Sequence, residues 1–157
     1  MVGAVIVTHH FIGKELIGAA EYLLEKMEGI IAVSIDANMN LFEIRKTLSD
    51  TIKKVDQGES ALIMTDVFGT IPSKIASSLL NDEKIEVITG VNLPMILTFW
   101  RYRKGRTLKE LAISLQLSGR RSIVRTKEII KTKIPFERIN SHHKTIGSSK
   151  IIKDTNW

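Results

Sequence analysis

The first hundred residues of the chain alternate between short apolar runs and longer segments in which apolar residues recur every three or four positions. The short runs are rich in β-branched residues and are bounded by polar residues or glycine, which is typical of buried strands. This pattern predicts four strands, at 3–7, 30–35, 61–65 and 85–89. The longer segments predict helices at 12–27, 41–55, 72–80 and from about 94 onward.

Several of the expected helices have recognisable starts. Asn40 with Glu43, and Thr107 with Glu110, have the spacing of a capping box, in which each side chain binds the backbone N–H of the other residue. Pro72 suits the first position of a helix, because its missing N–H would have no partner there in any case. A further helix is therefore expected after Thr107, and the chain beyond it resembles a basic helix or strand.

Strand–helix alternation repeated four times predicts the fold class. Parallel strands joined by right-handed helical crossovers give an α/β fold, a doubly wound and mainly parallel four-stranded sheet with helices on both faces. We expect the strand order 2-1-3-4, which makes the first and third strands neighbours. No internal repeat or Pro/Gly-rich linker divides the body, so we expect one domain over 1–134 and a polar, mobile or loosely docked tail over 135–157.

Composition narrows the possible classes of protein. The chain has 157 residues and no cysteine, which excludes disulfides, thiolate catalysis and Cys-based zinc sites. No apolar run approaches the ~20 residues that span a bilayer, and no signal-peptide pattern opens the sequence. We therefore expect a cytoplasmic protein.

The net charge of +6 is unevenly distributed. Residues 1–100 carry 8 Lys/Arg against 13 Asp/Glu, whereas 101–133 carry 11 against 2. A basic segment can bind nucleic acid, an anionic membrane or an acidic protein. A solvated helical face is the simpler interpretation, and nucleic-acid binding is not expected, because aromatic residues that would stack bases are not interleaved through the segment.

Candidate chemistry gathers where the strands end. Ligand sites in open α/β sheets lie at the carboxyl ends of the strands. Thr8-His9-His10 follows the first strand and Asp66 follows the third, so either histidine can meet Asp66 if those strands are neighbours. Such a pair suits a nucleophilic imidazole: one ring nitrogen attacks an electrophile such as a phosphoryl group, while the other donates its N–H to the carboxylate.

Other features of the sequence give weaker evidence about the kind of site. Gly69, before the Pro72 helix, allows a tight turn that presents N–H groups to an anion. The pair His142-His143 lies in the polar tail without strand context and is interpreted as incidental. The sequence contains no G-x-x-x-x-G-K-[ST], G-x-G-x-x-G, H-E-x-x-H or G-x-S-x-G motif. A response-regulator receiver would need an acidic pair after the first strand, where this chain has histidines.

Three segments taken together resemble a known family. Residues 4–9 (AVIVTH), 66–72 (DVFGTIP) and 90–95 (GVNLPM) are similar, in order and spacing, to signatures of the mannose-family enzyme IIA of the bacterial sugar phosphotransferase system. The third segment is the most specific. The resemblance covers about residues 1–130 and implies a flavodoxin-like, dimeric phosphocarrier domain within 1–134.

The resemblance also implies roles for individual residues. His9, and not His10, matches the histidine that accepts a phosphoryl group from HPr and passes it to a histidine of enzyme IIB. Asp66 matches the aspartate that orients it. The remaining phosphate-loop or binding positions are Thr8, Gly69, Thr70, Pro72 and Asn92. No metal and no cofactor beyond the covalent phosphohistidine is implied, and the membrane complex would be contacted only indirectly.

Two departures from the family pattern leave alternatives open. His10 stands where the family commonly has glycine, and Ile71 stands where it usually has a serine or threonine facing the phosphate. Thr70 or backbone N–H groups would have to replace that hydroxyl. The alternative function is a degenerate enzyme IIA scaffold acting as a non-catalytic regulatory binding protein. The IIA-like domain of phosphotransferase-dependent dihydroxyacetone kinase is disfavoured by the 90–95 motif, and sugar transport and regulation are not separated.

Overall fold

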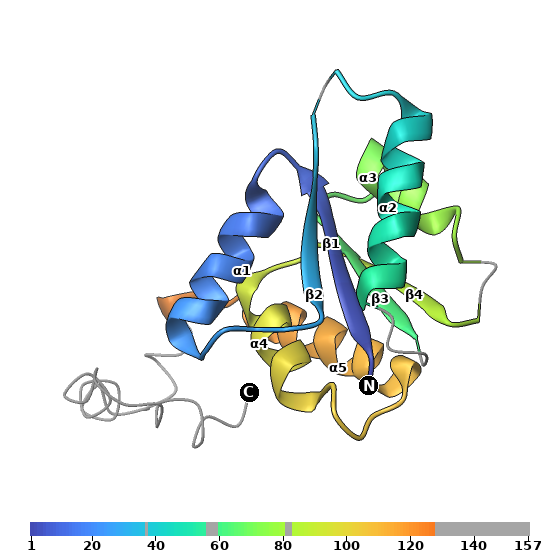
Figure 1. Cartoon of the computed structure of the whole chain (residues 1–157). Helices are drawn as coiled ribbons and strands as arrows, with labels where there is room; N and C mark the ends of the chain where they lie inside the picture. Colours follow the sequence, from blue (N-terminus) through green and yellow to red (C-terminus); the bar gives the residue numbers. More distant parts are fainter. Residues whose placement is uncertain (37, 56–59, 81–82, 128–157) are drawn as a thin grey trace. The chain divides into compact units, whose positions relative to one another are not determined.

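The computed structural model describes residues 1–36, 38–55, 60–80 and 83–127. Its centre is a four-stranded sheet whose neighbouring strands are all parallel, in the order β2-β1-β3-β4, which confirms the predicted fold class and strand order (Figure 1). The strands are β1 (Gly3–His9), β2 (Ile30–Ile35), β3 (Ala61–Thr65) and β4 (Ile85–Thr89). Three of the four coincide with their predicted limits, and β1 extends two residues further, through His9.

Five helices of the described residues cover the two faces of the sheet: α1 (Ile12–Leu23), α2 (Leu41–Val55), α3 (Ile71–Ser77), α4 (Leu93–Tyr102) and α5 (Leu108–Arg121). Helices α1, α4 and α5 lie on one face and α2 and α3 on the other (Figure 1). Their side chains form the two core clusters on these faces. The alternation of β1 explains this division. Ala4 and Ile6 point into the first cluster, whereas Val5 and Val7 point into the second.

Both predicted capping boxes are present. Glu43 N–H donates to Asn40 Oδ1 at 2.9 Å, and Asn40 N–H donates to Glu43 Oε2 at 3.3 Å. At the start of α5, Thr107 N–H donates to Glu110 Oε2 at 3.0 Å and Glu110 N–H donates to Thr107 Oγ1 at 3.3 Å. These bonds satisfy donors that a helix start leaves without intrahelical partners, so both helices begin where the sequence predicts.

Two helix ends differ from the prediction. The helix predicted over 12–27 ends at Leu23, because Leu24 leaves helical geometry with φ −116° and ψ −103°. The Glu21 side chain then accepts the N–H of Met27 at 3.0 Å, which allows buried Met27 to reach the core from an irregular segment. The predicted helix 72–80 begins at Ile71, one residue before Pro72, and ends at Ser77.

The chain divides into two compact units, residues 1–119 and 120–157. The described part of the second unit, 120–127, contains the last residues of α5, and there Ile123 N–H donates to the Arg120 carbonyl at 3.4 Å. The predicted domain boundary at 134, the tail 135–157 and the pair His142-His143 lie outside the described residues. No helix in the described ranges has the length and apolar character needed to cross a membrane.

Candidate functional site

The sheet brings together the two residues on which the predicted site depends. His9 is the last residue of β1, and Asp66 directly follows β3. These strands are hydrogen-bonded neighbours in a register that pairs Val7 with Thr65, so their carboxyl ends lie side by side. The predicted meeting of a histidine with Asp66 is confirmed, and the histidine is His9.

One carboxylate oxygen of Asp66 holds His9 at two points. Asp66 Oδ2 lies 2.8 Å from His9 Nδ1 and accepts the His9 backbone N–H at 3.0 Å. The other oxygen, Oδ1, accepts the N–H of Val67 at 2.9 Å. The Asp66 side chain is 8% exposed, whereas that of His9 is 47% exposed. The carboxylate is therefore fixed beneath an imidazole that solvent or a partner can reach.

These contacts keep Asp66 ionised. Burial, the largest single influence, raises the pKa of the Asp66 carboxyl, because a charged group loses water contacts. The hydrogen bonds from the His9 ring, the His9 backbone and the Val67 backbone outweigh it, and the pKa lies below its ordinary value of 3.8. A carboxylate in this state can stabilise positive charge that develops on the imidazole.

The neighbouring His10 has a different environment. Its backbone has φ 49°, a left-handed conformation that glycine adopts more easily, and its N–H donates to the Ile35 carbonyl at 3.0 Å. Its ring contacts the Phe11 ring edge-on, with 4.1 Å between centroids. The structure therefore pairs only the first of the two histidines with the carboxylate.

The loop after Asp66 is braced from within. Gly69 has φ 85°, and its N–H donates to the Ser73 hydroxyl at 2.8 Å. Ser73 in turn donates to the Thr70 carbonyl at 3.1 Å, and Thr70 Oγ1 donates to the Val67 carbonyl at 2.7 Å. Sequence reasoning missed Ser73. A serine in the first turn after a predicted helix start was the available signal, because short hydroxyl side chains often bind nearby backbone groups.

Two other predicted binding residues are also engaged in backbone contacts. Thr8 is buried, and its Oγ1 accepts the Gly13 N–H at 2.9 Å. Asn92 Oδ1 accepts the Met95 N–H at 3.3 Å and caps α4, which it precedes. Pro72 is buried in the first turn of α3. These contacts position the three loops, and direct contact of Thr8, Thr70 or Asn92 with a phosphate stays a prediction.

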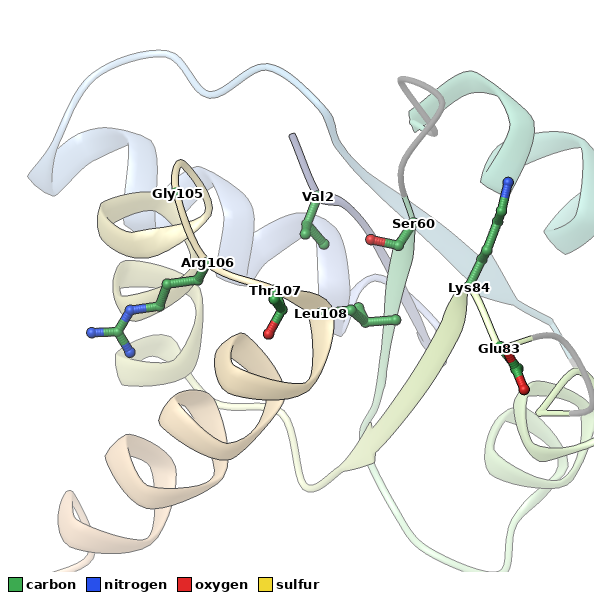
Figure 2. A pocket seen from close by; sticks show the side chains of 8 residues that line it. All are labelled: Val2, Ser60, Glu83, Lys84, Gly105, Arg106, Thr107 and Leu108. Atoms are coloured by element: carbon green, nitrogen blue, oxygen red, sulfur yellow. The ribbon is translucent and has the colours of Figure 1, made fainter.

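A separate depression of about 490 Å³ lies at the opposite edge of the sheet (Figure 2). Its lining includes Val2, Ser60 and Lys84, which precede β1, β3 and β4, together with the turn before α5. Figure 2 shows Arg106 and Lys84 extending in different directions and not converging on a common point. This depression offers no concentrated charge for a ligand.

The fold and the site together define a class of protein: an α/β domain with an exposed, carboxylate-oriented histidine at the carboxyl edge of a parallel sheet. In the tautomer whose Nδ1 carries the proton and donates a hydrogen bond to Asp66, Nε2 of His9 has a free lone pair. Nε2 has no hydrogen-bond partner among the described residues. No group of three or more His, Asp or Glu in that part of the chain is arranged to hold a metal ion.

Comparisons with known proteins agree with this class. The family model described as "PTS system fructose IIA component", where PTS denotes the phosphotransferase system, matches residues 3–116. A candidate phosphotransferase enzyme IIA component of Escherichia coli K12, YadI, is 30% identical over 115 residues, covering 70% of this chain and 76% of that protein. The mannose-specific EIIAB component of the same strain is 30% identical over 96 residues, which are 60% of this chain and only 30% of that protein.

A solved structure shows the same fold. The phosphotransferase system component EIIA from Streptococcus agalactiae superposes with a TM-score of 0.75 at 21% identity, covering 82% of this chain and 99% of that one. The chain belongs to the mannose/fructose enzyme IIA family of the sugar phosphotransferase system. The resemblance of the three sequence segments to that family is thus confirmed.

Proposed function

We propose that the protein is a phosphocarrier in carbohydrate uptake or its regulation, accepting a phosphoryl group from phospho-HPr on His9 and passing it to a histidine of enzyme IIB. Membership of the family supports a phosphocarrier role in sugar uptake. The double contact of Asp66 Oδ2 with the ring and backbone of His9 is the observation that carries the assignment to this residue.

The proposed step uses both nitrogens of the imidazole. The lone pair of His9 Nε2 attacks phosphorus, and the N–P bond of the donor phosphohistidine breaks with its electron pair returning to the donor imidazole. Nδ1 of His9 keeps its proton and donates a hydrogen bond to Asp66 Oδ2, so the positive charge that develops on the ring lies 2.8 Å from a carboxylate. Positioning and charge stabilisation dominate catalysis of such transfers. Passage to enzyme IIB is the same step in reverse, and it requires no other cofactor.

The wider setting is part of the proposal. We place the exchange in the cytoplasm between HPr and a mannose-family enzyme IIB, with the membrane complex contacted only through IIB. Because the chain spans about a third of the mannose EIIAB protein, its IIB partner would be a separate chain or domain. A homodimer is expected from the resemblance, and light scattering of the purified protein tests it.

The alternative, a degenerate scaffold without phosphoryl transfer, has less support. Its main argument is Ile71, which stands where a hydroxyl is usual. A scaffold without chemistry would not need a buried carboxylate bonded to an exposed imidazole, and this chain retains both. We therefore favour the phosphocarrier.

Incubation with enzyme I, HPr and phosphoenolpyruvate, followed by mass mapping of acid-labile phosphate, tests the proposal. We expect label on His9, none in His9→Ala, and undiminished label in His10→Ala. Label confined to His10 would overturn the assignment of the nucleophile. A wild-type protein that takes up no label would overturn the phosphocarrier function itself.

A further inference from the structure

Large apolar side chains are exposed on both sides of the histidine–aspartate pair. Single exposed apolar residues are ordinary on protein surfaces, but a group of them at one place marks a contact site. The exposed fractions are 84% for Phe68, 54% for Val67, 49% for Phe11 and 48% for Ile71. We call these four residues the apolar rim.

The rim is continuous with the proposed reacting group. Phe11 is two residues from His9, directly precedes α1 as its N-cap residue, and its ring contacts that of His10. Val67 and Phe68 directly follow Asp66, whose carboxylate is bonded to His9. Ile71 begins α3 after the same loop. The rim therefore flanks the site from the β1–α1 turn and from the β3–α3 loop.

Hydrogen bonds within the loop fix the backbone around Phe68, although the Phe68 side chain is exposed. The bonds of Gly69 with Ser73 and of Thr70 with Val67, at 2.8 and 2.7 Å, close the loop on itself. An aromatic side chain on a pre-ordered loop loses little conformational entropy when it binds, which makes it an effective anchor for a partner. The described residues leave the Phe68 ring exposed, so another protein can contact it.

The geometry of the reaction determines what that contact can be. Transfer between two protein histidines requires the reacting atoms to approach within about 3–3.5 Å. The His9 imidazole lies at the end of a strand and is half exposed. The surface around the donor's phosphohistidine must therefore contact the residues around His9. Those residues include the apolar rim, together with polar groups of the same loops. Ile71 has no polar side-chain atom to offer a phosphate, but it suits an apolar protein surface.

We propose that the apolar rim is the docking surface for phospho-HPr, with Phe68 and Ile71 as its main anchors, and that Ile71 contacts the partner protein instead of the phosphoryl group. The inference rests on the proposed function. It commits to a protein that presents an apolar surface around its phosphohistidine. A second copy of the chain on the same residues is an outcome that the test must detect.

Single-turnover transfer measures docking and chemistry separately. Purified phospho-HPr in excess, at a series of concentrations, is mixed with the protein, and labelling of His9 is followed by rapid quench. We expect Phe68→Ser and Ile71→Ser each to raise the half-saturating concentration of phospho-HPr by about tenfold while the limiting rate changes less than about twofold. Phe68→Leu, which keeps an apolar side chain, should restore most of the loss.

Matched controls exist in the same chain. Tyr22 on α1 is as exposed as Phe68, at 85%, and Ile113 on α5 is as exposed as Ile71, at 50%. Tyr22→Ser and Ile113→Ser should leave both kinetic constants unchanged. Circular dichroism and light scattering of each variant establish that its fold and oligomeric state are those of the wild type.

Each outcome separates the inference from the function on which it rests. A wild type that is not labelled on His9 removes the phosphocarrier and the docking surface together. A labelled wild type whose Phe68→Ser and Ile71→Ser variants keep the wild-type half-saturating concentration removes the docking surface alone. A lower limiting rate in Ile71→Ser at an unchanged half-saturating concentration would mean that residue 71 acts on the reacting groups. A changed oligomeric state in Phe68→Ser would instead assign the rim to a second copy.

Discussion

The two edges of the sheet are built for different purposes. At the carboxyl edge, one carboxylate holds one exposed imidazole, and large apolar side chains face solvent beside it. At the amino edge, the turn between α4 and α5 is crowded with cations that stack on aromatic rings. Arg103 lies 4.2 Å from the Trp100 ring centroid, and Arg106 lies 4.3 Å from that of Tyr102.

The difference shows how charge is used in each place. Arg103 is buried, donates to the Glu28 carbonyl, and has its pKa lowered by burial, an effect that nearby Glu28 partly opposes. It joins the end of α4 to the segment before β2. At the amino edge the buried cation Arg103 therefore joins two segments of the fold, whereas at the carboxyl edge the Asp66 carboxylate holds an exposed imidazole.

Of the substitutions that test this difference, Asp66→Asn at the carboxyl edge is expected to have the largest effect, which is on the rate of His9 labelling. The substitution removes the negative charge that stabilises the developing imidazolium and alters the ring tautomer that the carboxylate selects. We expect His9 labelling to slow on the order of 10²- to 10⁴-fold. Rapid-quench kinetics measure the loss, and an unchanged circular dichroism spectrum shows that the fold persists. Labelling at the wild-type rate would mean that phosphoryl transfer to His9 does not depend on the Asp66 carboxylate.

Gly3→Ala tests the opposite edge. A Cβ atom added at Gly3 would lie 2.1 Å from the Val55 carbonyl oxygen, a clash that only movement of the backbone can relieve. We expect the free energy of unfolding to fall by about 3 kcal/mol, as overpacking does in its severe cases. Urea denaturation measures this change. The folded fraction should label on His9 as fast as the wild type, and a slower rate would couple the two edges.

The pH dependence of stability should reveal the Asp66 contacts. Because folding lowers the pKa of this carboxyl below 3.8, its contribution to stability is fully present above that pH and is lost as pH falls through the lower, folded-state pKa. Urea denaturation between pH 2.5 and 6 should therefore show a steeper loss for the wild type than for Asp66→Asn. Equal slopes for the two proteins would contradict the pKa shift.

Removing exposed cations from the amino edge should have the smallest effect. Arg101 and Lys104 are exposed at the α4–α5 turn, far along the strands from His9. The double substitution Arg101→Ser with Lys104→Ser should change the half-saturating concentration of phospho-HPr less than about twofold, because docking is proposed to be apolar and to involve the other edge. A large increase that grows at low salt would show that this charge guides the partner.

Much of the fold could be predicted because the strands are short runs of apolar residues with clear polar limits. β2, β3 and β4 begin and end where the sequence predicts, and both capping boxes form. The early end of α1 could not be predicted, because apolar periodicity continues through Met27. The break at Leu24 and the contact of the Glu21 side chain with the Met27 backbone appear only in the structure, where Met27 reaches the core from outside a helix.

The histidine–aspartate pair of the site was predictable, but the contacts that support it were not. Position after adjacent strands was enough to bring a histidine to Asp66. The sequence does not distinguish a hydroxyl that binds phosphate from one that braces a turn, since both are short polar side chains in a loop. Thr8 and Thr70 have the second kind of contact in the structure, and Ser73 was missed for the same reason.

Asp66 Oδ2 accepts two hydrogen bonds from His9, one from the ring and one from the main chain, and these link the proposed reactivity to folding. Main chain and side chain are engaged by the same atom, so β1 cannot slip by one residue against β3 without turning the imidazole to the other face of the sheet. A misaligned molecule would be inert as well as unstable. Uptake of the label on His9 therefore also reports that these two strands have aligned correctly.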